Sequence, residues 1–199
     1  MTHTTSAGRY LKAKRWPLVI FLIVLLGLLG GLLGAPPGEA AGPGWPHETS
    51  DLATDPEVTF GRLPNGFRYV LMPNRTPRAR VSMHLNIQSG SLQESDAQQG
   101  LAHFLEHMLF NGSTHFPPGE LVKYFQSIGM QFGPDANAHT GFDETVYDIL
   151  LPDGDRVSIE KGLLVLRDYA DGALLLPAEI DRERKVILAE KRTRDSAAY

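Results

Sequence analysis

Residues 103–107 read His-Phe-Leu-Glu-His and lie within an apolar stretch, residues 101–110, that is typical of a helix. Residues four positions apart on a helix share one face at about 6 Å, so the imidazoles of His103 and His107 can point at one ion. Glu106 lies on the same side, close enough to hold a water molecule at that ion. This pattern is the inverted zinc motif H-x-x-E-H. The alternative interpretation is two partly buried core histidines with a surface glutamate.

A hydrolytic zinc site needs a third protein ligand and an open position for water. The chain contains no cysteine, so this ligand must be His, Asp or Glu. A helix predicted over residues 178–194 offers Glu183 and Glu190, seven residues apart and therefore two turns along one face. Residues 186–188 (Val-Ile-Leu) are expected to supply the apolar packing of this helix. Either glutamate could instead be a solvated carboxylate paired with a Lys or Arg four residues away.

The surrounding sequence predicts short strands and two more helices. An Asn-Gly turn and alternating apolar residues indicate the strands. The predicted strands are residues 58–60, 67–72, 80–88, 137–140 and 145–151. The predicted helices are 119–128 and 155–174, the second from the spacing of Val157, Ile159, Leu163, Leu164 and Leu166. Strand pairs with helices after them predict an α+β fold, with helices packed on one face of a mostly antiparallel sheet.

The N-terminal segment, residues 1–35, has the features of a membrane-targeting sequence. Four basic residues precede an uncharged apolar run, residues 17–35, whose helical length of roughly 28 Å matches a bilayer core. We expect an apolar helix that is either a cleaved signal peptide, with a small-x-small site at residues 38–40, or a retained anchor, which the length of the run favours. Both outcomes place the following domain outside the cytoplasm, either anchored on the periplasmic side or free in the periplasm.

Composition divides the rest of the chain and excludes several functions. Residues 36–56 form a Pro/Gly/Ala-rich linker, and residues 57–199 form the working domain. The 199 residues carry 19 Lys and Arg against 23 Asp and Glu, so nucleic acid is not an expected partner. The lack of cysteine excludes a thiol nucleophile, a disulfide scaffold and a thiolate metal site. The end of the chain soon after the last predicted helix suggests a fragment of a longer enzyme.

Three separated motifs carry a family resemblance. They are H-F-L-E-H-M-L-F-N-G (103–112), N-A-H-T (137–140) with D-E-T-V-Y after it, and E-R-K-V-I-L-A-E (183–190). In this order they resemble the N-terminal domain of the pitrilysin/insulinase-type (M16) metallopeptidases, from about Val58 to the end of the chain.

The resemblance implies a role for each candidate residue. His103, His107 and Glu190 would be zinc ligands, and Glu106 the general base. Glu183 would be an accessory acid that supports a ligand or the metal site without binding zinc.

A second implication concerns the substrate, which would bind as an added strand along an edge near Asn137, Ala138 and His139. His139, which stands where the family commonly has an aromatic residue, is either a substrate contact or an ordinary edge residue. His84 and His115 belong to no motif and are interpreted as surface or hydrogen-bonded residues.

The predicted function is zinc-dependent hydrolysis of peptides or small proteins outside the cytoplasm. Enzymes of the family are built from pairs of such domains, so a second M16-type domain or subunit is the expected partner. The alternative is a zinc-containing peptide-binding or partner subunit without turnover, because the second half is missing.

Overall fold

The computed structural model describes residues 44–194, which divide into two compact units: one ends at Pro73 and the other begins at Asn74. The expected signal or anchor, residues 1–35, and the first part of the linker lie outside the described residues. Within residues 44–194, no helix combines the length and the apolar character that crossing a membrane would require.

The first unit contains the predicted hairpin. Strands β1 (Thr59–Arg62) and β2 (Arg68–Leu71) pair antiparallel after a short 3-10 helix, η1 (Pro46–Thr49). The Asn65 side chain accepts a hydrogen bond from the Phe67 amide, and Gly66 adopts a φ of 87°. The Asn-Gly signal therefore works here as expected, since this turn needs a residue that tolerates positive φ.

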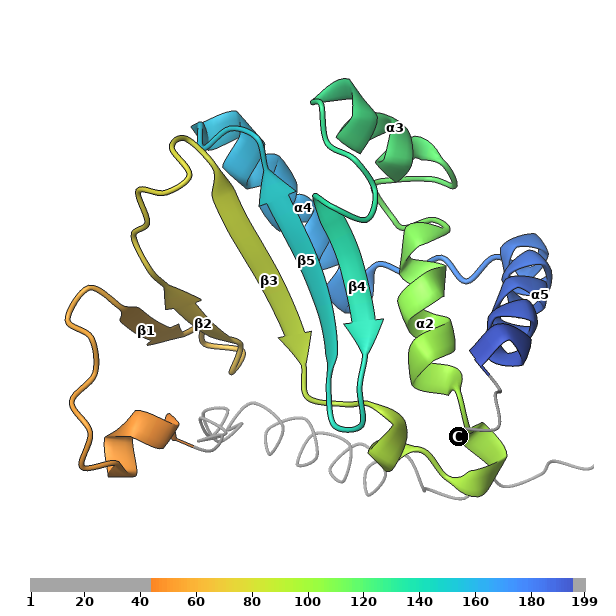
Figure 1. Ribbon diagram of the computed structural model, residues 1–199, viewed down its shortest axis with the longest axis horizontal. Helices are drawn as coiled ribbons and strands as arrows, with labels where there is room; N and C mark the ends of the chain where they lie inside the picture. The colour runs from red at the N-terminus through yellow and green to blue at the C-terminus, as the bar shows by residue number, and fades with distance from the viewer. Residues whose placement is uncertain (1–43, 195–199) are drawn as a thin grey trace, which may run out of the picture. The chain divides into compact units, whose positions relative to one another are not determined.

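The second unit carries a three-stranded antiparallel sheet in the order β3 (Val81–Ile87), β5 (Thr145–Leu151), β4 (Ala136–Thr140). Its helices are α2 (Leu101–Phe110), α3 (Glu120–Ser127), α4 (Arg156–Asp171) and α5 (Pro177–Arg194), with short 3-10 helices at Ser91–Gln93 and Asp96–Gln98. Figure 1 shows α4 behind the sheet and α2 between β4 and α5. The observed bounds lie within about three residues of the predicted ones.

The core lies on one face of this sheet. Alternate strand residues are buried there, among them Leu85, Tyr147 and Ile149, and both α2 and α4 pack against them. Their sequence neighbours, such as His84 and His139, face away and are exposed. The α+β prediction with helices on one face of an antiparallel sheet is therefore confirmed.

The predicted apolar face of α4 is partly wrong. Val157 and Leu163 are 74% and 55% exposed, whereas Val165 is fully buried. The reason is a close approach at Gly162, where an added Cβ would lie 2.8 Å from the Met83 sulfur. Packing through this glycine leaves Val157 and Leu163 in solvent, whereas the other three predicted positions, Ile159, Leu164 and Leu166, pack against the core.

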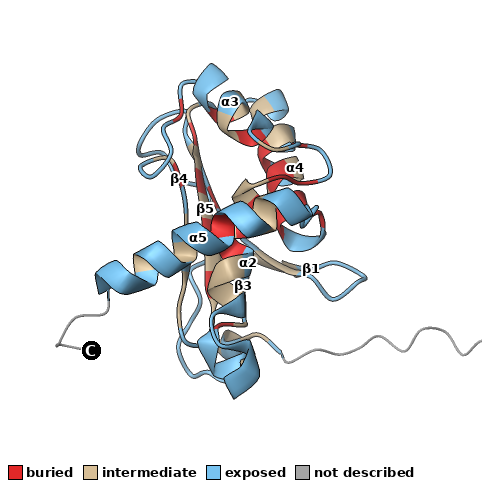
Figure 2. Ribbon diagram, turned by 90° about the vertical axis from the view of Figure 1, so that its right-hand side faces the viewer, coloured by how far each residue is buried: buried red, intermediate tan, exposed pale blue. Residues whose placement is uncertain are grey.

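The prediction that residues 186–188 supply the apolar packing of α5 is also wrong at two of the three positions. Val186 and Leu188 are 46% and 47% exposed, and Ile187 is partly buried. Helix α5 packs against α2, and its buried residue is a carboxylate, Glu183 (Figure 2). The face turned to α2 is thus the polar stripe of the two glutamates, which leaves most of the apolar residues outside.

Candidate metal centre

Helix α2, which carries both motif histidines, is fixed at each end. The Glu94 carboxylate accepts hydrogen bonds of 2.7 Å from the amides of Gly100 and Ala102, which otherwise have no partner in the first turn. After the helix, Gly112 adopts a φ of 124°, a conformation that suits glycine at a helix C-terminus. The two histidines therefore sit on a short helix with capped ends.

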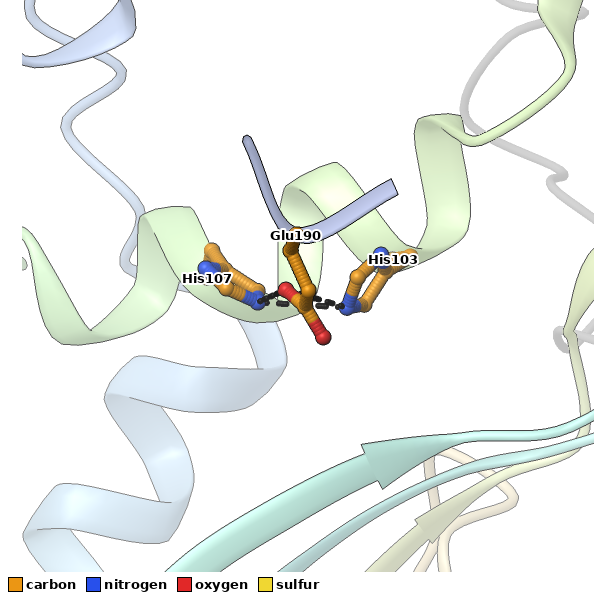
Figure 3. Close-up of side chains that lie close together, drawn as sticks. All are labelled: His103, His107 and Glu190. Atoms are coloured by element: carbon orange, nitrogen blue, oxygen red, sulfur yellow. Dashed lines mark hydrogen bonds and ion pairs between the residues drawn. The ribbon is translucent and has the colours of Figure 1, made fainter. Parts of the chain in front are cut away.

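Three candidate ligands converge between α2 and α5. The Nε2 atoms of His103 and His107 are 3.2 Å apart, and the Glu190 Oε2 atom lies 3.7 Å from the first and 3.5 Å from the second (Figure 3). The other Glu190 oxygen pairs with Arg194 at 2.5 Å. Within residues 44–194, these three residues form the one group of His, Asp or Glu close enough together to hold a metal ion.

The size and chemistry of this triangle fit zinc. With ligand bonds of about 2.0–2.2 Å, two atoms of a tetrahedral zinc site lie about 3.3–3.5 Å apart. The three observed separations, 3.2 to 3.7 Å, bracket that value. Two imidazole nitrogens and a carboxylate oxygen are also a donor set that zinc accepts, and they leave a fourth position open.

A second carboxylate orients one of the histidines. Glu183, which is buried, lies 2.8 Å from the Nδ1 atom of His107, on the opposite side of the ring from Nε2. When His107 donates its Nδ1 hydrogen to Glu183, the Nε2 lone pair faces His103 and Glu190. Glu183 therefore occupies the position of an outer-shell partner, which fixes the tautomer and the ring orientation of a ligand.

Asn111 completes this arrangement; it lies within the 103–112 motif but was given no role from the sequence. Its side-chain amide donates to the second Glu183 oxygen at 2.8 Å and to the His107 carbonyl at 3.2 Å. Its oxygen accepts from Arg182 on α5 at 3.2 Å. The available signal was its spacing of four residues from His107, which places it on the same face of α2.

Glu106 lies on the inner side of α2. It is 7% exposed, and its Oε2 atom accepts a 2.6 Å hydrogen bond from the Thr140 hydroxyl on β4. Burial raises the pKa of the nearby Tyr147 hydroxyl, and the negative charge of Glu106 raises that pKa further. Thr140, which ends the N-A-H-T motif but was given no role from the sequence, thus holds one oxygen of Glu106 and leaves the other oxygen available.

The predicted substrate residues lie on β4, an edge strand of the described sheet next to α2. Asn137 and His139 are exposed on the face away from the helices, and Ala138 is partly buried. The Leu150 amide donates to the Asp135 carbonyl at 2.7 Å, which shows that the odd-numbered residues of β4 direct their backbone groups at β5. The backbone N–H and C=O of Ala138 are therefore turned toward the open edge.

His84 and His115, which belong to no motif, both have partners. His115 contacts Asp168 at 2.7 Å, and the exposed His84 contacts Asp148 at 2.5 Å. Their interpretation as hydrogen-bonded or surface residues is confirmed.

Comparisons with known proteins identify the family of this chain. The sequence profile of the family described as Insulinase (Peptidase family M16) matches residues 69–198. The "Probable zinc protease PqqL" of Escherichia coli (strain K12) is 38% identical over 148 residues, covering 74% of this chain and 16% of that protein. The chloroplastic stromal processing peptidase of Pisum sativum is 32% identical over 153 residues, covering 75% of this chain and 11% of that protein.

Solved structures of proteases are also similar to this chain. The first half of the periplasmic protease PqqL from Escherichia coli matches with a TM-score of 0.70 and 38% identity, over 74% of this chain and 31% of that structure. The ferredoxin protease FusC, in complex with Arabidopsis ferredoxin, matches with a TM-score of 0.65 and 34% identity, over 71% of this chain and 16% of that structure.

The fold and the sequence match those of metallopeptidase domains. The chain belongs to the insulinase-type M16 peptidase family. It spans about a sixth of the length of the PqqL relatives that it matches.

Proposed function

We propose that this chain is the zinc-binding catalytic domain of an M16 metalloendopeptidase. His103, His107 and Glu190 hold the ion, and Glu106 is the general base. The observation that carries the proposal is the triangle of ligand atoms, with separations of 3.2, 3.5 and 3.7 Å. It is assembled from two helices whose ligand residues are more than 80 positions apart in the sequence.

The protein groups around this site have distinct tasks. A bound zinc ion would activate a water molecule and polarise the carbonyl of the scissile peptide bond. Glu106 takes a proton with the oxygen that Thr140 leaves available, and then gives the proton to the leaving amine. Glu183 keeps the Nδ1 hydrogen of His107 in place, so that Nε2 stays a ligand atom throughout.

The substrate is a peptide or small protein that adds an extended segment to β4. Ala138 offers an outward N–H and C=O, which can pair with a substrate strand in the manner of β-augmentation. Asn137 and His139 flank it with exposed side chains. Because Thr140, two residues further along the same strand, contacts Glu106, a segment bound at this edge would run toward the proposed general base.

Two further parts of the proposal concern the whole protein. A second M16-type domain or subunit completes the substrate site, which is supported by relatives that are about six times longer than the matched region. The working location is outside the cytoplasm, as it is for the periplasmic protease PqqL, with residues 1–35 as a membrane anchor or a cleaved signal.

The test combines metal content with peptide hydrolysis. The purified chain should contain one zinc ion per molecule by elemental analysis. With a second M16-type half added, it should also cleave a quenched fluorescent peptide in a reaction that a chelator stops and added zinc restores. Glu106→Gln should keep the zinc but lower the rate about 100- to 10,000-fold. Glu190→Gln and His103→Ala should lose stoichiometric zinc, whereas Asp181→Asn, an exposed carboxylate change on the same helix, should retain it.

Each result has a separate meaning. Stoichiometric zinc in both Glu190→Gln and His103→Ala would refute the ligand assignment. Stoichiometric zinc in the wild-type chain without hydrolysis, alone or with a second M16-type half added, would leave the peptide-binding partner subunit as the function.

A further inference from the structure

A second buried polar cluster lies where the end of α2 meets the segment that leads into α5. Ser113 and Ala173 form an antiparallel bridge. Beside it, the Thr114 amide donates to the Gly172 carbonyl at 2.9 Å, and the Leu174 amide donates to the Gly112 carbonyl at 3.2 Å. We call residues 112–115 and 172–174, together with the Asp168 side chain, the clasp.

The Asp168 carboxylate lies at the centre of the clasp. It is 2% exposed and belongs to α4, a helix that contributes no ligand. It accepts hydrogen bonds from the Ser113 hydroxyl at 2.6 Å, the His115 amide at 2.8 Å and the His115 Nδ1 atom at 2.7 Å. A buried carboxylate is costly unless it is hydrogen-bonded, and all three donors come from the loop that follows α2. This loop is therefore held in one position against α4.

Short segments connect the clasp to both ligand helices. Ser113 is six residues after His107, and α2 ends between them. On the other side, three residues separate Ala173 from the start of α5 at Pro177. One of them, Leu175, has a φ of 47°, a left-handed conformation that a leucine holds only where its surroundings impose it. A shift of the clasp would therefore move α5 relative to α2.

We propose that Asp168 is a positioning residue of the metal centre. By accepting hydrogen bonds from Ser113 and His115, it sets the spacing between α2 and α5. This spacing decides whether the Glu190 oxygen reaches the Nε2 atoms of His103 and His107. The proposal rests on the zinc site of the proposed function. Such sites tolerate displacements of only about 0.5 Å, so a small movement of α5 is enough to weaken binding.

The test variant is Asp168→Asn in the whole chain. An asparagine has one acceptor oxygen, so it cannot serve both N–H donors of His115 at their present positions. We expect the zinc dissociation constant, measured by competition with a chelator, to rise about ten-fold or more. We also expect the visible absorption spectrum of the cobalt-substituted protein to change, because it reports ligand geometry.

A matched control separates positioning from loss of stability. Val165→Ala removes packing from a fully buried position of the same helix, one turn before Asp168. It should bind zinc with the wild-type dissociation constant and give the wild-type cobalt spectrum. If Asp168→Asn does not fold, Ser113→Ala, which removes one donor and keeps the backbone bridge, is judged by the same comparison, with an increase in the dissociation constant again expected.

A metal-free measurement keeps this inference distinct from the proposed function. Since the chain has no cysteine, spin labels can be placed through Leu101→Cys on α2 and Leu188→Cys on α5, both exposed positions. The distance distribution between them should broaden or shift in Asp168→Asn and stay unchanged in Val165→Ala. A folded Asp168→Asn protein with the wild-type zinc affinity and wild-type distances would overturn the inference. If the wild-type chain binds no zinc, the proposed function fails, and the label distances alone decide whether the clasp sets the helix spacing.

Discussion

Replacing Glu183 with glutamine tests whether the buried carboxylate prepares His107 for metal binding. Glu183 accepts two hydrogen bonds of 2.8 Å, one from His107 and one from Asn111. Glutamine has nearly the same shape but one acceptor oxygen, and its amide group donates. In Glu183→Gln, one of the two donors must therefore face another donor, or His107 must move its hydrogen to the ring nitrogen that should bind zinc.

The expected size of the effect follows from the hydrogen bond that is lost. A hydrogen bond to a charged group contributes about 1.5–3 kcal/mol. Since about 1.4 kcal/mol corresponds to a factor of ten, the zinc dissociation constant should rise about 10- to 150-fold. This range agrees with the roughly 10- to 100-fold effects typical of outer-shell partners of a zinc ligand.

The measurement is a chelator competition for zinc at neutral pH, on protein that circular dichroism shows to be folded. Asp181→Asn is the matched control, because it makes the same chemical change on α5 at an exposed carboxylate that pairs with Arg184. It should change the dissociation constant less than about two-fold, as expected for a surface ion pair. Wild-type zinc affinity in folded Glu183→Gln would refute the reasoning.

Three further predictions concern Asn111, Asp168 and Gly90. Asn111→Leu removes the second donor to Glu183 and should weaken zinc binding about three- to ten-fold in the same competition assay. Asp168 should make the fold sensitive to acid. Burial would raise the pKa of its carboxyl, but hydrogen bonds from Ser113 and His115 and the charge of His115 lower it below the ordinary value of 3.8. The unfolded state then binds the proton more tightly than the folded state. The stability that Asp168 contributes is therefore fully present above pH 3.8 and is lost as the pH falls through the lower pKa of the folded state. Urea unfolding at a series of acidic pH values should show a smaller loss in Asp168→Asn, and an equal loss in both proteins would contradict this. Gly90→Ala should destabilise the fold by about 1–3 kcal/mol in the same experiment at neutral pH, because its Cβ would lie 2.5 Å from the Gly141 carbonyl oxygen. Unchanged stability would show that the turn can move aside.

The strands and helices could be predicted from the sequence because their signals are local. Alternation marks β3 and β5, and the apolar run marks α2, whose observed bounds, Leu101–Phe110, match the predicted 101–110. The orientation of α4 could not be predicted in the same way. It depends on the space that Met83 and Leu151 leave at Gly162, and Met83 lies 79 residues earlier in the sequence.

The residues of the candidate site differ in how much of their placement and role could be predicted from the sequence. The spacing of His103 and His107 is sufficient to place both on one helix face. Spacing does not separate Glu183 from Glu190, because both lie on one face of α5, and only the family resemblance assigned them different roles. In the structure, Glu183 lies at Nδ1 of His107 and Glu190 at Nε2. Thr140 reaches Glu106 from 34 residues away, a distance at which no local pattern operates.

The polar character of the α2–α5 contact predicts that the proposed zinc ion strengthens the docking of α5. Val186 and Leu188 are exposed, so much of the contact rests on Glu183, Glu190 and their partners. Without a cation, two imidazole nitrogens and a carboxylate oxygen lie within 3.7 Å of one another, and only the hydrogens on the ring nitrogens can join them. An ion bound only by the docked state stabilises that state by about 2.7 kcal/mol at a hundred times its dissociation constant. Chelation should therefore accelerate hydrogen exchange in residues 177–194 before it affects β5, whereas equal protection with and without zinc would show that α5 docks independently of the metal.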